Sequence, residues 1–412
     1  MEKPKIRFKG YQEDWEQRKF GDYNDLMTGY PFESDKFSED GIKLVRGMNV
    51  KRGYLDFSED ICVKWNSCVG LENFLLKDGD ILIQMDGALI GKSYAKIKEN
   101  QLPALLVQRV TRARTNNKFA SQDFMYQTIQ RDFLRYIEMN KTETAVPHLS
   151  LNDIRNFEIM VPCLAEQKKI GEYFDSLDNL ITLHQRKREE MKTLKKYMLQ
   201  KMFPQNGQLV PQIRFSGFTE DWEQRKLGNI TVKIGSGKTP LGGKSAYVET
   251  GIPLIRSQNV NGDKVDFADI VYIDEATDEL MANSRVYTND VLLNITGASI
   301  GRSAVYEGLE SANVNQHVCI IRPTEGHQPD FIQLNLSSDN GQKQIDASQA
   351  GGGREGLNFQ EIGKMQFSFP SLNEQKAIGR YFNCLDHLIT LHQQKCDELR
   401  NIKKFMLQNM FV

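Results

Sequence analysis

The feature that most constrains this chain is a long segment that occurs twice. Residues 162–203 and 370–411, aligned at an offset of 208, agree at 26 of 42 positions. Each segment begins with a proline and contains no further glycine or proline after Gly171 or Gly379, so each is predicted to be one continuous helix. About forty residues at 1.5 Å each make a rod of roughly 60 Å, which is longer than an ordinary core helix.

Apolar residues recur along both rods at heptad spacing, which predicts that each rod packs against another helix. The obvious partner is the other copy, and we expect an antiparallel coiled coil. The residues assigned to helix pairing and partner docking are Ile170, Phe174, Leu177, Ile181 and His184, with Ile378, Phe382, Leu385, Ile389 and His392 in the second copy. The same stripe is predicted to continue through Leu194, Met198 and Met202, and through Leu399, Met406 and Met410.

His184 and His392 occupy equivalent positions at the middle of the two rods. Two interpretations stay open for them. Each is either a partly exposed coiled-coil residue, or the two imidazoles approach each other at the centre of the pair and set its register, as a polar residue in such a stripe often does.

The duplication extends beyond the rods. Residues 6–22 return as residues 213–229 with 12 of 17 positions identical, and residues 204–211 form a breaker-rich linker. The middle regions diverge but keep matching short β-branched runs closed by glycine, asparagine and aspartate, which indicates strands and turns. We therefore predict an α/β (α+β) fold with an internal pseudo-two-fold repeat. Its parts are a first α/β domain with its arm at 1–161, a rod at 162–203, a linker at 204–212, a second domain with its arm at 213–369, and a second rod at 370–412.

Composition and motifs exclude several classes of protein. No apolar run reaches the roughly 18 residues of a membrane span and the start lacks the apolar core of a signal peptide, so we expect a cytoplasmic protein. The six cysteines form no CxxC pair, which disfavours a metal or disulfide framework. The segment Gly235–Thr239 resembles a phosphate loop, but Val232 stands where the first glycine is required. We find no catalytic motif and no metal-binding cluster.

Two variable α/β domains separated by paired rods, each rod entered through P-x-L-x-EQK-x-I, resemble the specificity subunit of type I restriction–modification systems. The residues that carry the resemblance are Pro162, Leu164, Glu166, Gln167, Lys168 and Ile170, repeated as Pro370, Leu372, Glu374, Gln375, Lys376 and Ile378. The arms around Trp15 and Trp222, the Gly235–Pro240 segment and the Asn315-Gln316 step are also similar to the family. The first half has Val107-Gln108 instead, which favours a structural role for Asn315.

The resemblance implies a non-catalytic subunit in which each α/β domain reads one half of a bipartite target in double-stranded DNA and the rods set the spacing. It implies two methyltransferase subunits docked on the rods and restriction/translocase subunits beyond them. S-adenosylmethionine, ATP and Mg would be bound by those partners, with no cofactor in this chain. Such partners would complete the DNA clamp, which accounts for a formal net charge of only −1.

Arginine, lysine, asparagine, glutamine and histidine on loops are the side chains that would meet base edges or phosphates. The residues predicted to contact DNA are Arg46, Asn49, Lys92, Arg109, Arg112 and Lys141 in the first half, and Lys238, Arg256, Asn259, Arg302, His317 and Arg354 in the second. An alternative is a duplicated coiled-coil scaffold that binds other proteins without DNA. An enzyme with an unrecognised site is a third possibility.

Overall fold

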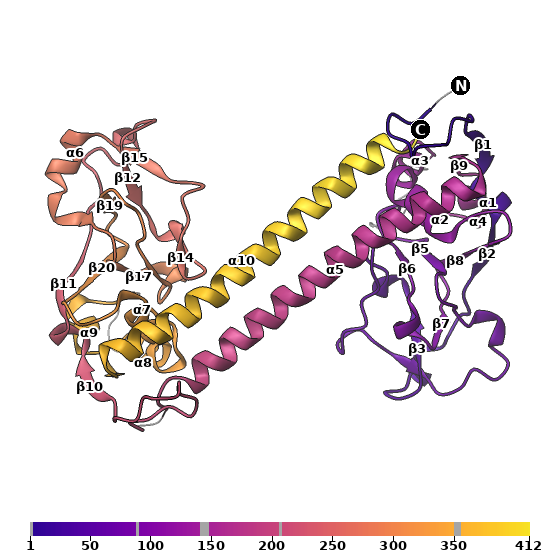
Figure 1. Cartoon of the computed structure of the whole chain (residues 1–412). Helices are drawn as coiled ribbons and strands as arrows, with labels where there is room; N and C mark the ends of the chain where they lie inside the picture. The colour runs from indigo at the N-terminus through magenta and orange to yellow at the C-terminus, as the bar shows by residue number, and fades with distance from the viewer. Residues whose placement is uncertain (1–2, 88–89, 141–147, 206–207, 350–355) are drawn as a thin grey trace. The chain divides into compact units, whose positions relative to one another are not determined.

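The computed structural model describes residues 3–87, 90–140, 148–205, 208–349 and 356–412. The chain divides into two compact units, Met1–Gln185 with Gln393–Val412 (unit 1) and Arg186–His392 (unit 2). Each unit contains one mixed α/β domain, head 1 (residues 16–161) or head 2 (residues 223–369), and one half of each of two long helices (Figure 1). The duplication read from the sequence is therefore a duplication of structure.

Head 1 is built on an antiparallel sheet in the order β2-β8-β5-β6, beside a three-stranded sheet β4-β3-β7 and the short pair β1-β9. Its strands are β1 (Glu16–Lys19), β2 (Asn24–Thr28), β3 (Ile42–Val45), β4 (Lys64–Trp65), β5 (Ile81–Gln84), β6 (Tyr94–Lys96), β7 (Ala104–Leu106), β8 (Val110–Thr115) and β9 (Glu158–Val161). Its helices are α1 (Phe20–Tyr23), α2 (Gln122–Thr128), a π-helical turn (Ile129–Phe133), α3 (Leu134–Asn140) and α4 (Leu151–Arg155). Residues 122–140 thus form one helical segment that contains a π-helical turn.

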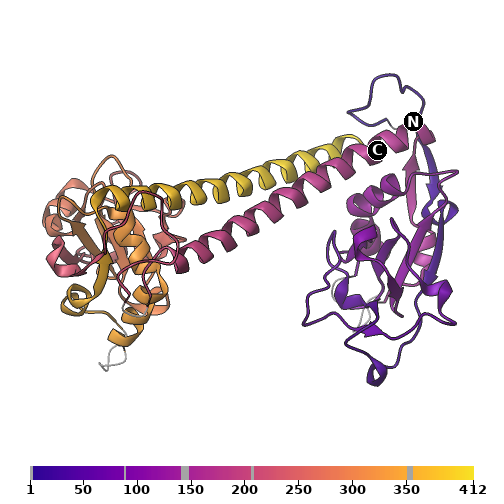
Figure 2. The same ribbon diagram turned by 60° about the horizontal axis from the view of Figure 1, so that its bottom comes forward.

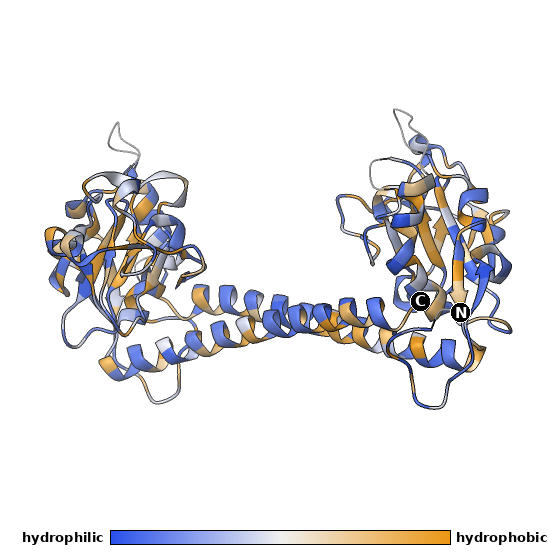
Figure 3. Ribbon diagram, turned by 90° about the horizontal axis from the view of Figure 1, so that it is seen from above, coloured by the Kyte–Doolittle hydropathy of each residue, from blue (hydrophilic) through white to orange (hydrophobic). Residues whose placement is uncertain are grey.

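Head 2 repeats this plan, with sheets in the orders β11-β20-β17-β18 and β15-β12-β19-β16 and the pairs β10-β21 and β13-β14. Its strands are β10 (Glu223–Lys226), β11 (Thr231–Ser236), β12 (Ile252–Ile255), β13 (Val260–Asn261), β14 (Lys264–Val265), β15 (Val271–Ile273), β16 (Arg285–Val286), β17 (Val291–Asn294), β18 (Ser303–Val305), β19 (Ala312–Val314), β20 (Val318–Pro323) and β21 (Gln366–Phe369). Its helices are α6 (Glu275–Leu280), α7 (Pro329–Ser337), α8 (Asp339–Gln349) and α9 (Phe359–Lys364). The apolar strands of both heads form their cores (Figure 3).

The two long helices are α5 (Leu164–Lys201) and α10 (Leu372–Asn409), each close to the predicted bounds. In unit 1 the rings of Phe174 and Phe411 lie 5.9 Å apart, and further along Lys403 binds Asp178, so residue numbers rise on one helix as they fall on the other. In unit 2 the equivalent contacts are Phe203 with Phe382, at 6.3 Å, and Lys195 with Asp386. The predicted antiparallel pairing is confirmed in each unit.

Most of the predicted pairing residues are buried in the cores of their units. These are Ile170, Phe174, Leu177, Ile181, Ile378, Phe382 and Leu385, whereas Ile389 is half-buried. Leu194 is exposed, so its assignment to the stripe was wrong. Met198 and Met202 pack in the core of unit 2 as predicted, and Met191 packs there as well. The approach of His184 to His392 stays a prediction.

The EQK motif at the start of each long helix is a structural joint between the arm, the head and the helix. Arg7 donates to both carboxylate oxygens of the buried Glu166, at 2.7 and 2.8 Å. The amide of Gln167 donates to the carbonyl of Pro162 and accepts from the backbone N–H of Ser121. Unit 2 repeats the joint with Arg214 on Glu374, at 2.7 and 2.8 Å, and with Gln375 on Pro370 and Gln328.

The ends of the chain lie together in unit 1, where the backbone N–H of Ile6 donates to the carbonyl of Asn409 (Figure 2). The equivalent bond in unit 2, from Ile213 to Lys201, spans the linker between the halves. Thus the arm of the first half packs on the C-terminal end of α10, and the arm of the second half packs on the C-terminal end of α5. Within the described part of the chain, none of the helices combines the length and hydrophobicity that crossing a lipid bilayer requires.

Candidate nucleic-acid interface

A lysine from one long helix fastens each head to the other long helix. In unit 1 the Lys403 ammonium donates to Asp178 at 2.6 Å and to Gln130 of head 1 at 2.7 Å. In unit 2 the equivalent Lys195 contacts Asp386 at 2.7 Å and Asp263 of head 2 at 2.9 Å. Because each lysine is tied both to a head and to the opposite helix, it restrains the orientation of the surface that the head presents.

The pKa values of the two lysines are shifted in opposite directions. Burial lowers the pKa of both ammonium groups, because the charged form is disfavoured away from water. For Lys403 burial outweighs the attraction of Asp178 and the pKa is lowered. For Lys195 two carboxylates, Asp263 and Asp386, outweigh burial and the pKa is raised. Both side chains are largely buried and their ammonium groups bind side chains of the heads and of the opposite helix, so they fasten the heads and do not face solvent as DNA contacts.

Two of the residues predicted to contact DNA are turn residues inside the heads. Asn49 is 0% exposed and Asn259 is 2% exposed. The side-chain oxygen of each accepts from a backbone N–H three residues earlier, and the amide nitrogen donates to the carbonyl of Asp56 or Asp266. With their polar atoms occupied inside the protein, these asparagines hold the turns and do not reach a base, which corrects the prediction for both.

Arg46 and Arg256, which begin the same turns, also bond mainly within the protein. Each guanidinium donates to a backbone carbonyl of a nearby loop, Ile61 for Arg46 and Asp269 for Arg256. The pKa of Arg46 is lowered, chiefly by burial. We assign both arginines to loop positioning.

Arg112 is likewise removed from the predicted DNA contacts. Its side chain is 4% exposed within β8, where it forms an ion pair with Asp25, and burial is the main cause that lowers its pKa. Ile320 stands at the equivalent position of head 2, in β20. A position that an isoleucine fills in the other head belongs to the interior of the sheet.

The remaining described candidates lie where DNA could reach them. Arg109, Lys92, Lys238 and Arg302 are exposed and His317 is half-buried. Lys141 and Arg354 lie outside the described residues.

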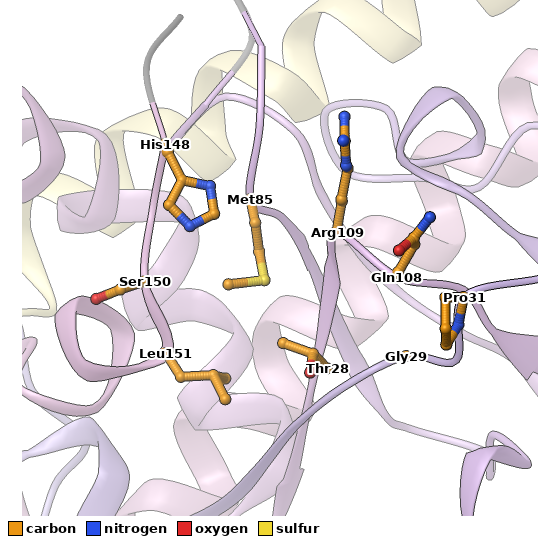
Figure 4. A pocket seen from close by; sticks show the side chains of 9 residues that line it. All are labelled: Thr28, Gly29, Pro31, Met85, Gln108, Arg109, His148, Ser150 and Leu151. Carbon is orange, nitrogen blue, oxygen red and sulfur yellow. The ribbon is translucent and has the colours of Figure 1, made fainter. Parts of the chain in front are cut away.

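Arg109 belongs to a group of side chains where three segments of head 1 meet, which we call strand-end cluster 1: Asp86, Gln108, Arg109 and His148. Asp86 follows β5, Gln108 and Arg109 precede β8, and His148 precedes α4. The Asp86 carboxylate lies 3.2 Å from Nε of Arg109 and also contacts Nδ1 of His148. Gln108, Arg109 and His148 line an open pocket of about 480 Å³, from which the Arg109 side chain extends outward (Figure 4).

Head 2 holds an equivalent group, strand-end cluster 2: Thr296, Gln316 and His317. The Thr296 hydroxyl lies 2.5 Å from Nδ1 of His317, and Nε2 of His317 lies 2.9 Å from the side-chain nitrogen of Gln316. The backbone N–H of His317 donates to the side chain of Asn315 at 3.1 Å. This bond agrees with a structural role for Asn315.

A glycine at the rim of each cluster permits close passage of two chain segments. A Cβ on Gly29 would lie 2.4 Å from the carbonyl oxygen of Leu106, and one on Gly237 would lie 1.6 Å from that of Val314. Both glycines follow the first core strand of their head at equivalent positions. Only a residue without a side chain lets this strand pass the other segment at that distance.

Of the residues in the two clusters, the predicted DNA contacts included Arg109 and His317 but not Asp86, Thr296, Gln108, Gln316 and His148. Asp86 and Thr296 lie in two similar segments, residues 80–93 and 290–303, from which only the cations Lys92 and Arg302 were predicted to contact DNA. The signal for Asp86 and Thr296 was that the two residues are equivalent, polar and of different types. Among the described residues, His, Cys, Asp and Glu side chains form no group of three that could hold a metal ion.

Comparison with known proteins agrees with this duplicated architecture. Residues 12–193 and residues 219–401 each match the model of the type I restriction modification DNA specificity domain. The type I restriction enzyme EcoBI specificity subunit of Escherichia coli is 26% identical over 384 residues, covering 86% of this chain and 76% of the relative. The MjaVIII specificity subunit of Methanocaldococcus jannaschii is 22% identical over 416 residues, covering 95% and 91%.

Among solved structures, the S subunit of a type I restriction–modification system from M. genitalium matches with a TM-score of 0.68. The match covers 100% of this chain and 99% of that one at 16% identity, so it demonstrates a shared fold. Because the two family matches together span most of the sequence, the chain belongs to the type I restriction–modification DNA specificity family.

Proposed function

We propose that this chain is the sequence-specific DNA-recognition subunit of a type I restriction–modification complex, with each head reading one half of a bipartite target. The observation that carries the proposal is that one fold, built twice, places Asp86 and Arg109 in one strand-end cluster where the other has Thr296 and His317. Identical heads would read identical half-sites. Heads that share a scaffold and differ in exposed polar groups are suited to reading two different sequences.

The test uses the full chain assembled with its methyltransferase partner. Methylome sequencing of a host that carries both should reveal modified adenines in one motif with two defined halves and an undefined spacer. Binding of the purified complex to that motif should weaken steeply as salt is raised, because phosphate contacts release counterions. A complex that assembles but neither methylates nor binds DNA selectively would point to the scaffold alternative instead.

The long helices carry exposed apolar side chains that we propose as docking surfaces for two methyltransferase subunits. In unit 1 the exposed side chains are Leu180, Leu183, Ile402 and Phe405, and in unit 2 the equivalents are Leu388, Leu391, Leu194 and Tyr197, of which Leu388 is half-buried. Within each helix the apolar pairs are three residues apart and so lie side by side. Two surfaces of one kind on a duplicated scaffold fit two copies of one partner.

Substitution of one docking surface at a time should halve the number of bound methyltransferase subunits. We expect Phe405→Ser or Tyr197→Ser to weaken one of the two binding events by roughly tenfold or more, since buried aromatic anchors dominate interfaces. The double variant should lose both. Native mass spectrometry of the mixture measures the stoichiometry directly.

The matched controls are Lys404→Ser and Lys196→Ser, which alter equivalent exposed neighbours on the same helices. Each control also introduces a serine at an exposed position of the helix, and it should leave two methyltransferase subunits bound. Unchanged stoichiometry in the Phe405 and Tyr197 variants would reject these surfaces as docking sites. In our proposal these partner subunits, and not this chain, methylate adenine with S-adenosylmethionine and carry out any translocation that depends on ATP and Mg.

The length of α5 and α10 is proposed to set the spacing between the two halves of the DNA target. Inserting one heptad into both helices, after Gln185 and after Gln393, adds about 10.5 Å of helix. At about 3.4 Å per base-pair step the undefined spacer should grow by up to roughly 3 base pairs. Methylome sequencing reports the new spacer, and a motif with the original spacer would contradict this role of the helices.

A further inference from the structure

The two strand-end clusters stand on the same backbone scaffold. In head 1 the N–H of Met85 donates to the carbonyl of Arg109 at 2.9 Å, and in head 2 the N–H of Ile295 donates to that of His317 at 3.0 Å. In each head a leucine N–H also donates to the carbonyl of the same residue. Leu149 donates to Met85 at 2.8 Å, and Leu357 donates to Ile295 at 2.9 Å. The two heads therefore share these backbone hydrogen bonds around their clusters, although the positive φ of Arg109 is not repeated at the equivalent His317.

Arg109 adopts a backbone conformation that disfavours a side chain. Its φ is +69°, in the left-handed region that glycine occupies without penalty and other residues occupy at a cost. Such a conformation at an exposed loop residue is a reason to ask what the side chain does. The Arg109 side chain is 71% exposed, so it does not stabilise the core of the head in return for this strain.

The Asp86 carboxylate forms an ion pair with the Arg109 guanidinium. The contact is with Nε, at 3.2 Å, so the two terminal amino groups remain for a partner outside the protein. Asp86 also contacts His148, which holds the carboxylate from a third segment. Through these terminal groups the guanidinium can present two parallel N–H donors, the arrangement that matches O6 and N7 of guanine in the major groove.

Cluster 2 orients an amide instead. The side-chain N–H of Gln316 donates to Nε2 of His317, which leaves the imidazole proton on Nδ1 to donate to the Thr296 hydroxyl. The exposed Gln316 amide is thereby held by a chain of three residues. A fixed glutamine amide offers one acceptor and one donor side by side, which matches N6 and N7 of adenine.

Building on the proposed function, we propose that each strand-end cluster reads one base pair and that its residues specify which one. Arg109, positioned by Asp86 and His148, reads a guanine in the half-site of head 1. Gln316, positioned by His317 and Thr296, reads an adenine in the half-site of head 2. Asp86, His148, His317 and Thr296 are positioning residues, because they act through the side chain that meets the base.

The experiment compares methylomes and DNA-binding profiles of complexes that differ only in these residues. Arg109→Ala should relax one position of the head 1 half-site, where guanine is preferred in the parent, with discrimination falling roughly tenfold to a hundredfold. The head 2 half-site should stay unchanged. Gln316→Ala should do the reverse, at an adenine position. Asp86→Asn should weaken the guanine preference less than Arg109→Ala does, because the reading group remains but loses its ionic partner.

Two further variants keep the test decisive if a change disturbs folding. Arg109→Gly relieves the left-handed backbone strain, so it should fold at least as stably as the parent and still lose the guanine preference. Lys118→Ala removes a charge from an exposed turn of the same head and should leave the motif unaltered. Thermal unfolding and methyltransferase binding, measured on all variants, separate loss of reading from loss of structure.

The outcomes distinguish this inference from the proposal on which it rests. A parent complex with a defined bipartite motif, together with an Arg109→Gly complex with the identical motif, would refute base reading by cluster 1 while leaving DNA recognition intact. Binding that weakens equally on all sequences would assign Arg109 to a phosphate and also refute it. A parent complex without any motif would refute the proposed function itself.

Discussion

Replacing Phe411 by alanine is expected to lower the free energy of unfolding of unit 1 by about 3–5 kcal/mol, the usual cost of truncating a buried phenylalanine. Phe411 is 5% exposed. Its ring stacks on Phe124 of head 1 at 5.3 Å and lies 5.9 Å from Trp15. The residues that directly follow α10 are therefore part of the head 1 core, and the substitution opens a cavity between segments almost 300 positions apart in the sequence.

Denaturant unfolding followed by tryptophan fluorescence measures the effect, since Trp15 reports on this core. Phe405→Ala is the matched control: Phe405 lies six residues earlier, within α10, is 55% exposed, and its substitution should change stability little. In unit 2 the equivalent residue, Phe203, stacks on Phe331 at 5.3 Å, and Phe203→Ala should destabilise that unit. Equal, small effects of Phe411→Ala and Phe405→Ala would contradict the assignment of the chain end to the core.

Exchanging residues 230–368 for the corresponding segment of a relative with another DNA target should replace one half of the recognised motif completely and leave the other half as it was. The exchange keeps the joint of Arg214 with Glu374 and the contact of Lys195 with Asp386. It removes Asp263, the second partner of Lys195. Because an incompletely paired buried lysine is costly, the donor segment should carry an acidic residue at that position.

Methylome sequencing identifies both half-sites in one measurement. The reciprocal exchange of residues 23–160 serves as the control, since it should alter only the other half. If either exchange changed both half-sites, or abolished modification in a complex that still assembles, the heads would not act as independent readers. A donor without the acidic residue should give a less stable unit 2 with the same new half-site, which separates stability from specificity.

Much of the architecture could be predicted from the sequence because it is a repeated local pattern. Two segments without helix breakers, marked by heptad spacing, are helices almost wherever they occur, and duplication supplied each with a partner of its own kind. The buried positions Phe174 and Phe382 were predictable for the same reason. The matching β-branched runs and turn residues of the two middle regions likewise indicated two similar α/β domains.

Which polar residues face outward was decided by tertiary structure. Asn49 and Asn259 recur in matching turns because the turns need their side chains, and the repeat alone could not separate that need from a need to bind DNA. Leu194 fits the heptad count, yet it is exposed, as is the equivalent Ile402 in the other long helix. Periodicity shows which residues share a face, but the side chains around a position determine whether that face is covered. For the same reason the pairing of Asp86 with Arg109, 23 positions apart, is visible only once the strands between them have folded.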